Sequence, residues 1–200
     1  MFVNGKVANA NFSWGPGVNR LVSPRNCCIE TDGKPLYRLT YAFPYLLNRV
    51  GVRMGELFSR RIAGYDVTLP MYRVMAALWE RGDQRLGDLA AMTSIEISTL
   101  SRLIGTMKRK GLVSRKRLAD NARTVAINLT AKGKTLVEEL IPIAMHFEDV
   151  AVRSFSAKEI AELKATLGNI YENLDTLEPE IREAKASAKA NGAKANIARR

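Results

Sequence analysis

The sequence has few of the residues from which catalytic and metal centres are usually built. Its 200 residues include a single histidine, His146, and two neighbouring cysteines, Cys27 and Cys28. One histidine leaves no Ser-His-Asp arrangement of the usual kind, and adjacent cysteines lack the spacing of a metal-ligand set. The Gly-Pro-Gly segment at 15–17 is not a phosphate-binding loop. We therefore predict no catalytic residue, no metal site and no cofactor, and an enzyme is the least favoured class of function.

Long apolar runs are also missing. No segment approaches the roughly 18 apolar residues of a membrane span, and residues 1–11 lack the apolar core of a signal peptide. We expect a cytoplasmic protein without a membrane partner. There, Cys27 and Cys28 are not expected to form a structural disulfide, because a bond between neighbouring cysteines is strained. Two reduced thiols are one alternative, and a thiol sensor activated by Arg25 is the other.

The residues in excess are the basic ones. The formal net charge is +11, from 31 Lys and Arg residues against 20 Asp and Glu residues. Because many basic proteins bind no nucleic acid, the position of the charge is more informative than its total. Between Ile95 and Arg123, eight basic residues are accompanied by only two acidic ones, Glu96 and Asp120. This segment is therefore a candidate for contact with a polyanion.

The segment 85–110 predicts two short helices joined by a tight turn. The first covers about 85–92 and the second about 96–110, where Gly111 ends it. The second helix has an inward apolar stripe of Leu100, Leu103, Ile104 and Met107. Its outer face carries Ser98, Thr99, Ser101 and Arg102. Such a face is either merely solvated or suited to reading base edges in a groove of DNA.

A basic β-hairpin follows this helix pair. Alternation of Val125, Ile127 and Leu129 with polar or small residues predicts a half-buried strand, and residues 119–122 supply a turn. Cations on both sides of that turn favour contact with an anion. We therefore predict a winged helix-turn-helix that binds DNA through Ser98, Thr99, Ser101, Arg102, Lys108, Arg115, Arg117 and Arg123.

Further amphipathic helices surround this motif. Apolar spacings of three and four predict a helix over about 44–63 and another that is capped by Thr68 and ended by Gly82. A fifth helix runs to about Val152, with a kink expected at Pro142. A sixth begins at a capping box, Ser156 to Glu159, and carries a heptad seam. That seam would be buried within the chain or by a second copy, and consists of Ile160, Leu163, Leu167, Ile170, Leu174 and Leu177.

The chain resembles the multiple antibiotic resistance regulator (MarR) family. The segments that carry the resemblance fall in register without gaps and are 89–90, 98–104, 110–115 and 125–133. The resemblance implies a homodimer held by the first, fifth and sixth helices, with the fourth helix in the major groove and Arg123 directed to the minor groove. Two positions depart from the family pattern. Asn121 replaces an acidic residue that steadies the wing arginine, and Glu96 replaces a small capping residue, so that Thr93 and Glu96 would form an earlier capping box.

The predicted fold class is mainly α with a small β-wing, a winged helix-turn-helix plus a helical dimerisation region. Residues 67–130 form the DNA-binding domain, and residues 39–66 and 131–178 form the dimerisation region. Residues 1–38 are rich in Asn, Gly, Pro and Ser and are expected to form an irregular arm. Residues 179–200 are expected to form a basic tail, as a frayed helix or an irregular segment.

The resemblance also implies an effector pocket where the first, second and fifth helices meet. Aromatic and Met walls with one or two Arg would suit an aromatic carboxylate or an acyl thioester. The same residues are also explained as core and solvated helix edge. The candidate lining residues are Arg49, Arg53, Tyr72, Met75, Trp79 and His146.

The predicted function is that of a dimeric, ligand-responsive repressor, released from a pseudo-palindromic operator in double-stranded DNA by a small molecule. One alternative is a thiol-sensing regulator that uses Cys27 or Cys28. Another is an architectural protein that binds DNA without sequence preference.

Overall fold

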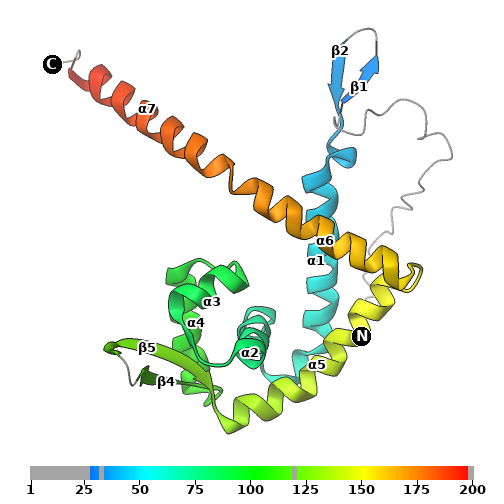
Figure 1. Ribbon diagram of the computed structural model, residues 1–200, viewed down its shortest axis with the longest axis vertical. Helices are drawn as coiled ribbons and strands as arrows, with labels where there is room; N and C mark the ends of the chain where they lie inside the picture. The colour runs from blue at the N-terminus through cyan, green and yellow to red at the C-terminus, as the bar shows by residue number, and fades with distance from the viewer. Residues whose placement is uncertain (1–27, 32–33, 119–120, 198–200) are drawn as a thin grey trace, which may run out of the picture. The chain divides into compact units, whose positions relative to one another are not determined.

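The chain is mainly helical, with a small three-stranded antiparallel sheet, as predicted. The computed structural model describes residues 28–31, 34–118 and 121–197 (Figure 1). These residues divide between Leu140 and Ile141 into two compact units. The elements are β1 (Cys28–Thr31), β2 (Lys34–Tyr37), η2 (Leu39–Tyr41), α1 (Phe43–Arg61), η3 (Ala63–Tyr65), α2 (Leu69–Arg81), β3 (Gln84–Arg85), α3 (Leu86–Thr93), α4 (Ile97–Arg109), β4 (Val113–Leu118), β5 (Asn121–Leu129), α5 (Ala131–Val152), α6 (Ala157–Leu174) and α7 (Leu177–Ile197).

The hairpin of β1 and β2 corrects the expectation of an irregular arm. Cys28 pairs with Tyr37 and Thr31 with Lys34 in an antiparallel ladder. Four-residue strands are too short to show a clear hydrophobic period. The Asp32-Gly33 dipeptide between them, a frequent hairpin turn sequence, is the signal that could have identified the hairpin. Cys27 lies outside the described residues, so the structure does not test the thiol hypothesis.

Local signals set the ends of the helices in the first unit. Pro44 lies in the first turn of α1, and the Thr68 side chain accepts a hydrogen bond of 3.4 Å from the amide of Met71 at the start of α2. Gly82, with a φ of 74°, ends α2, and Gly111, with a φ of 71°, follows α4. These starts and stops agree with the sequence predictions. The helices enclose a core that includes the fully buried Ile62, Val74, Met75, Leu89, Leu100, Ile104, Met107 and Leu112.

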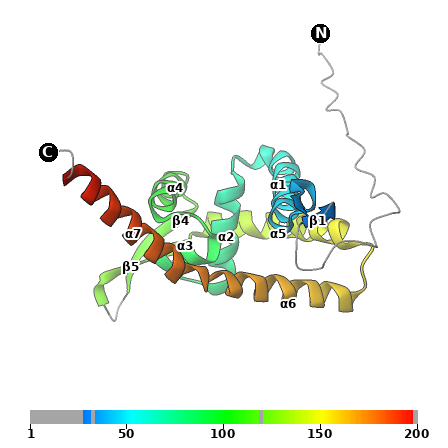
Figure 2. The same ribbon diagram turned by 90° about the horizontal axis from the view of Figure 1, so that it is seen from above.

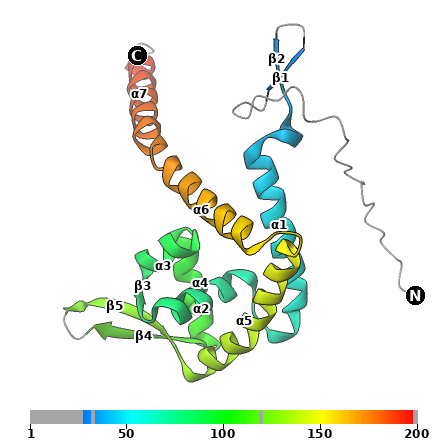
Figure 3. The same ribbon diagram turned by 45° about the vertical axis from the view of Figure 1, so that its right-hand side comes forward.

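The sheet has the order β3-β5-β4, with β5 in the centre (Figure 3). Strand β3 was not predicted, and it includes Arg85, which was expected to open the third helix. The expected alternation along β5 is also wrong at one end, because Val125 is 44% exposed whereas Ala126 is 1% exposed. Ala126 pairs with both neighbouring strands, but Val125 lies beyond the end of β3 and pairs with β4 alone.

The start of α5 packs tightly against the segment that follows α4. The Thr130 hydroxyl donates to the Gly111 carbonyl at 2.6 Å, and the Gly133 amide donates to the Thr130 hydroxyl at 3.0 Å. Gly133 is buried, and a Cβ atom at this position would lie 2.1 Å from the Leu112 carbonyl oxygen. Only glycine therefore fits this position without a backbone shift.

The second unit contains the end of α5 together with α6 and α7 (Figure 2). The predicted capping box is confirmed, since the Ser156 amide donates to the Glu159 carboxylate at 2.8 Å and the Glu159 amide donates to the Ser156 hydroxyl at 3.3 Å. Lys164 of α6 forms an ion pair of 2.6 Å with Glu148 of α5. The heptad seam does not run along one helix as expected, because α6 ends at Leu174 and Leu177 begins α7.

Helix α7 extends to Ile197, so most of the expected basic tail is helical. Pro142 lies inside α5, and the expected kink there stays a prediction. None of the helices in the part of the chain that the structure describes is long and apolar enough to span a membrane.

Replacement of Gly133 by Ala should lower the free energy of unfolding by about 3 kcal/mol, because the new methyl group overlaps the Leu112 carbonyl. Gly87→Ala is the matched control. Gly87 also lies in a helix of the first unit, has no atom within 4 Å of a built Cβ, and should be neutral or stabilising by up to about 1 kcal/mol. Urea denaturation of both variants measures the difference. Equal stability of the two variants would contradict the tight packing at Gly133.

Candidate nucleic-acid interface

Helix α4 begins with a side-chain cap supplied by Glu96. The Glu96 Oε2 atom accepts a hydrogen bond of 2.9 Å from the Thr99 amide and a second from the Ser98 hydroxyl. The expected capping box of Thr93 and Glu96 does not form. Thr93 is instead the buried last residue of α3, and its hydroxyl donates to the Leu89 carbonyl at 2.6 Å. Ser94, with a φ of 53°, makes the tight turn between the two helices.

The cap keeps the Glu96 carboxylate ionised. The Ser98 hydroxyl, followed by the backbone amides of Ser98 and Thr99, lowers the pKa of Glu96 from 4.5 to about 2. A hydrogen bond to the charged form favours that form, and the Glu96 side chain remains exposed to solvent. A fixed negative charge therefore stands at the start of this helix.

The two faces of α4 separate as predicted. Leu100, Ile104 and Met107 are fully buried, and Leu103 is half-buried. On the other side, Ser101 is half-buried and the remaining predicted contact residues are exposed, namely Ser98, Thr99, Arg102 and Lys108. The structure thus presents a polar helical surface in front of a packed core.

Ile97, the first residue of α4, is 55% exposed. The sequence does not reveal this, because Ile97 is three residues before Leu100 and seven before Ile104 and so has the period of the buried stripe. The apolar stripe of α4 therefore starts at Ile97, before the first residue of this helix that packs in the core. An exposed aliphatic side chain therefore stands beside the Glu96 carboxylate.

A groove of about 380 Å³ separates α4 from the sheet. It is lined by Leu86, Ser101, Arg115, Val125 and Ile127. Ser101 and Arg115 were both predicted to contact DNA, and the fold brings them to the same groove although they are on different elements. An anion or a polar edge at this groove would meet a hydroxyl and a guanidinium together.

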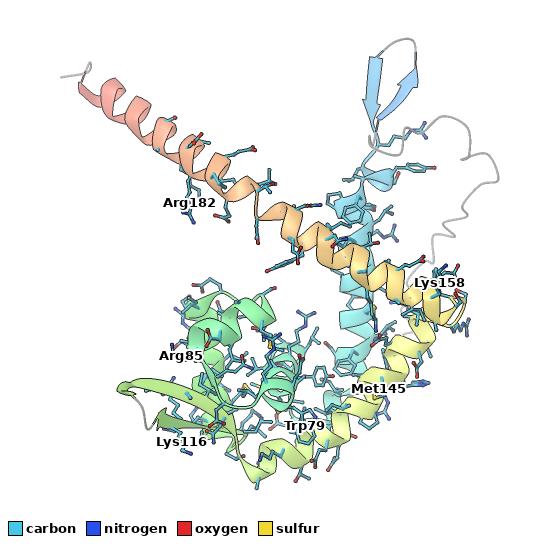
Figure 4. The ribbon with its side chains drawn as sticks, viewed as in Figure 1. Trp79, Arg85, Lys116, Met145, Lys158 and Arg182 are labelled. Carbon is cyan, nitrogen blue, oxygen red and sulfur yellow. The ribbon has the colours of Figure 1, made fainter. Side chains whose placement is uncertain are left out.

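Two cations that the sequence prediction did not include as contact residues lie on the sheet. Arg85 of β3 and Lys116 of β4 are both exposed, and each pairs with Ala126 of the central strand (Figure 4). Paired residues in a ladder share a face of the sheet. Arg85 was not identified from the sequence because β3, the strand that places it in the same sheet as β4 and β5, was not predicted.

Other cations of the basic segment are bonded within the protein. The Lys110 ammonium forms an ion pair with the Asp66 carboxylate and lowers the pKa of that carboxyl. The Arg109 guanidinium donates to the Thr106 hydroxyl at 2.9 Å. Arg117 and Arg123 belong to β4 and β5, but their side chains are outside the described set, and their role stays a prediction.

The candidate effector residues do not surround one cavity of the first unit. Met75 is fully buried in the core, which agrees with its alternative assignment as a core residue. Trp79, labelled in Figure 4, is 45% exposed. Tyr72 packs its ring 4.7 Å from that of Phe58 and lines a cleft of about 370 Å³ between α2 and α3. His146 is exposed in the second unit.

A larger cleft, of about 950 Å³, lies between α1 and α2 and contains one of the candidates, Arg53. Arg60 and Arg73 line it as well, with Glu56 as an acidic neighbour. The Arg49 guanidinium instead lies 5.7 Å from the ring centroid of Tyr45. No cluster of three or more His, Cys, Asp or Glu side chains suited to a metal ion occurs among the residues described.

The sequence of this chain is similar to those of known proteins. A model of the MarR family matches residues 67–125. The chain is 24% identical over 136 residues to the HTH-type transcriptional repressor IacR of Pseudomonas putida, a match that covers 68% of this chain and 81% of IacR.

The chain is also similar to solved structures. A MarR family transcriptional regulator from Silicibacter pomeroyi DSS superposes with a TM-score of 0.63 and 26% identity, covering 68% of this chain and 91% of that one. The Staphylococcus aureus MepR chain in a MepR–DNA complex has a TM-score of 0.62 and 23% identity, with 68% and 98% covered.

The stability contributed by Glu96 should depend on pH. Because its pKa is lower in the folded chain than the ordinary 4.5, this contribution is complete above about pH 4.5 and is lost as the pH falls towards 2. The difference in unfolding free energy between the parent chain and Glu96→Gln, measured by urea denaturation, should be constant above pH 5 and shrink below it. Carbon-13 NMR of the Glu96 carboxyl gives the pKa directly, and titration near 4.5 would contradict the observed cap.

Proposed function

We propose that the chain is a DNA-binding transcriptional regulator of the MarR type, and that it acts as a dimeric repressor released from a pseudo-palindromic operator by a small molecule. The observation that carries the proposal is the structure of α4. Its exposed face presents Ser98, Thr99 and Arg102, while the opposite face is anchored in the core.

In the proposed complex, α4 enters the major groove and the sheet lies over the adjoining backbone. Arg102 is positioned on α4 to donate two hydrogen bonds to a guanine edge, a contact that discriminates between bases. Arg115 and Lys116, on β4, would neutralise phosphates, which adds affinity but no base preference. MepR, a protein of similar fold, has been crystallised in complex with DNA, which supports DNA binding by this fold.

Exposed apolar side chains on α1, α6 and α7 support a homodimer. Helix α1 exposes Phe43, Leu47, Val50 and Met54, at intervals of three and four residues. Helices α6 and α7 expose Leu163, Leu167, Leu174, Leu177 and Ile181. Aliphatic surfaces of this extent are uncommon on monomers. A two-fold dimer would cover them and place two α4 helices about one turn of DNA apart.

The α1–α2 cleft supports an acidic effector. Three arginines, Arg53, Arg60 and Arg73, line a space large enough for a small aromatic acid or part of an acyl thioester, and Arg53 also forms an ion pair of 4.0 Å with Glu56. Leu69 and Val52 supply apolar walls. Release of DNA then requires that the effector bind more tightly to the free dimer than to the dimer on its operator, with the same coupling free energy measured from either side.

Replacement of Arg102 by Ala should weaken binding to the operator by about 1–3 kcal/mol and reduce the ratio of operator affinity to random-duplex affinity. Arg153→Ala, which removes an equal charge at an exposed position after α5, is the control and should preserve the ratio. The two affinities come from fluorescence anisotropy at fixed salt, with an operator selected from a random duplex pool. A parent chain with equal affinity for both duplexes would support a non-specific architectural protein instead.

Simultaneous replacement of Leu167 and Leu174 by Asp should give monomers, because four charges per dimer would be buried in the proposed interface. Ala165→Asp with Asn169→Asp places the same charges on another face of α6 and should leave the dimer intact. Sedimentation equilibrium measures the mass of each variant. A Leu167→Asp, Leu174→Asp variant that remains dimeric would count against this interface.

A further inference from the structure

The first turn of α4 carries two side chains that do not suit a surface made only for phosphate contact. Glu96 brings a negative charge into the most basic part of the chain, where it repels a polyanion. Ile97 exposes more than half of its surface at the adjacent position. Neither residue adds to electrostatic attraction, so a contribution of either to DNA binding would come from specific contacts.

The Glu96 carboxylate is held in one orientation but keeps accepting capacity. Both bonds that define the cap end on Oε2, from the Thr99 amide and from the Ser98 hydroxyl. An ionised carboxylate has about four acceptor sites, so these bonds do not exhaust its accepting capacity. The Ser98 proton is committed to the cap, so Ser98 has no hydroxyl proton left to donate to a base. At Glu96 and Ser98, the start of α4 therefore offers an oriented, ionised acceptor rather than a donor.

Ile97 offers a rigid apolar contact beside this acceptor. It is the first residue of α4, and its β-branched side chain has few rotamers in a helix. Being 55% exposed, it has aliphatic surface available to a partner. In the major groove, the matching apolar group is the methyl group of thymine.

This inference rests on the proposed function, in which the start of α4 meets base edges. We propose that Glu96 and Ile97 are specificity-determining residues. Glu96 accepts a hydrogen bond from the amino group of a cytosine, and Ile97 contacts the methyl group of a nearby thymine. In the major groove the cytosine amino group has an acceptor on one side only, O6 of the paired guanine, whereas the adenine amino group lies between two acceptors, its own N7 and O4 of the paired thymine. Guanine and thymine present acceptors that repel a carboxylate, and adenine places an acceptor beside its amino group. Glu96 therefore rejects these bases as well as selecting cytosine.

The alternative is that Glu96 serves only as a helix cap, and a substitution separates the two roles. Serine is among the best capping residues, so Glu96→Ser keeps the cap while it removes the charge and the reach of the side chain. We expect Glu96→Ser to bind unselected DNA more tightly than the parent chain, because one repulsive charge is gone. The preference for cytosine at one position of each half-site should fall by about 5- to 150-fold.

The experiment selects binding sequences from a random 30-base-pair duplex pool, using the full chain and its variants in parallel. Glu96→Gln is a second variant of nearly the same shape, and its amide should shift the preference from cytosine towards adenine. Glu139→Ser removes an exposed acid from α5, gives the same change in net charge, and should select the parent sequence. Thermal unfolding of each variant checks that it is folded.

Ile97 is tested with modified DNA. Replacing the contacted thymine by uracil removes a single methyl group and should lower the affinity of the parent chain about four-fold. Ile97→Ala should bind both duplexes alike.

The outcomes distinguish this inference from the function on which it rests. If the parent chain selects a sequence but Glu96→Ser and Ile97→Ala select the same one, the two residues do not read bases, and the repressor function stands. If the parent chain selects no sequence, the proposed function fails, and base reading by Glu96 and Ile97 fails with it. The inference is established if Glu96→Ser loses the cytosine preference and if replacing thymine by uracil lowers the affinity only of chains that keep Ile97.

Discussion

The start of α5 packs so closely on the segment after α4 that a Cβ atom at Gly133 would lie 2.1 Å from the Leu112 carbonyl oxygen. At this point the start of α5 meets the end of α4, and the Lys132 ammonium donates to the Lys110 carbonyl at 3.0 Å. The Lys110 side chain in turn bonds to Asp66, between α1 and α2. Asp66 and the start of α5, two segments far apart in the sequence, thus hold the C-terminal end of α4. The N-terminal end extends past the core, which is why its first turn is available to a partner.

Affinity and specificity have different origins in this arrangement. The exposed cations Arg85, Arg115 and Lys116 lie on the sheet, whereas Lys110 and Arg109 are engaged within the protein. A net charge of +11 attracts any nucleic acid, and attraction of that kind cannot distinguish sequences. Discrimination has to come from the small set of groups on α4 whose orientation is fixed. The Glu96 cap is one such group, because its hydrogen bonds fix the carboxylate before DNA arrives.

The helices and the hairpin of β4 and β5 could be predicted from the sequence because amphipathic periods, caps and turn residues are local signals. The short strands β1, β2 and β3 could not, since a period needs more residues than they contain. The exposed face of α4 was predictable from its buried stripe. The exposure of Ile97 was not, because it depends on where the core ends. Of the arginines that line the α1–α2 cleft, Arg53 was identified from the sequence but Arg60 and Arg73 were not, because the lining of a cleft depends on how the two helices pack.

Methylation protection tests the central claim, that α4 docks in the major groove of its operator. Dimethyl sulfate modifies guanine at N7, in the major groove, and adenine at N3, in the minor groove. On a guanine-containing duplex selected by the full chain, the account predicts protection of guanine N7 in two patches about one helical turn apart. Formation of a specific complex on that duplex with guanine N7 methylation unchanged would contradict it.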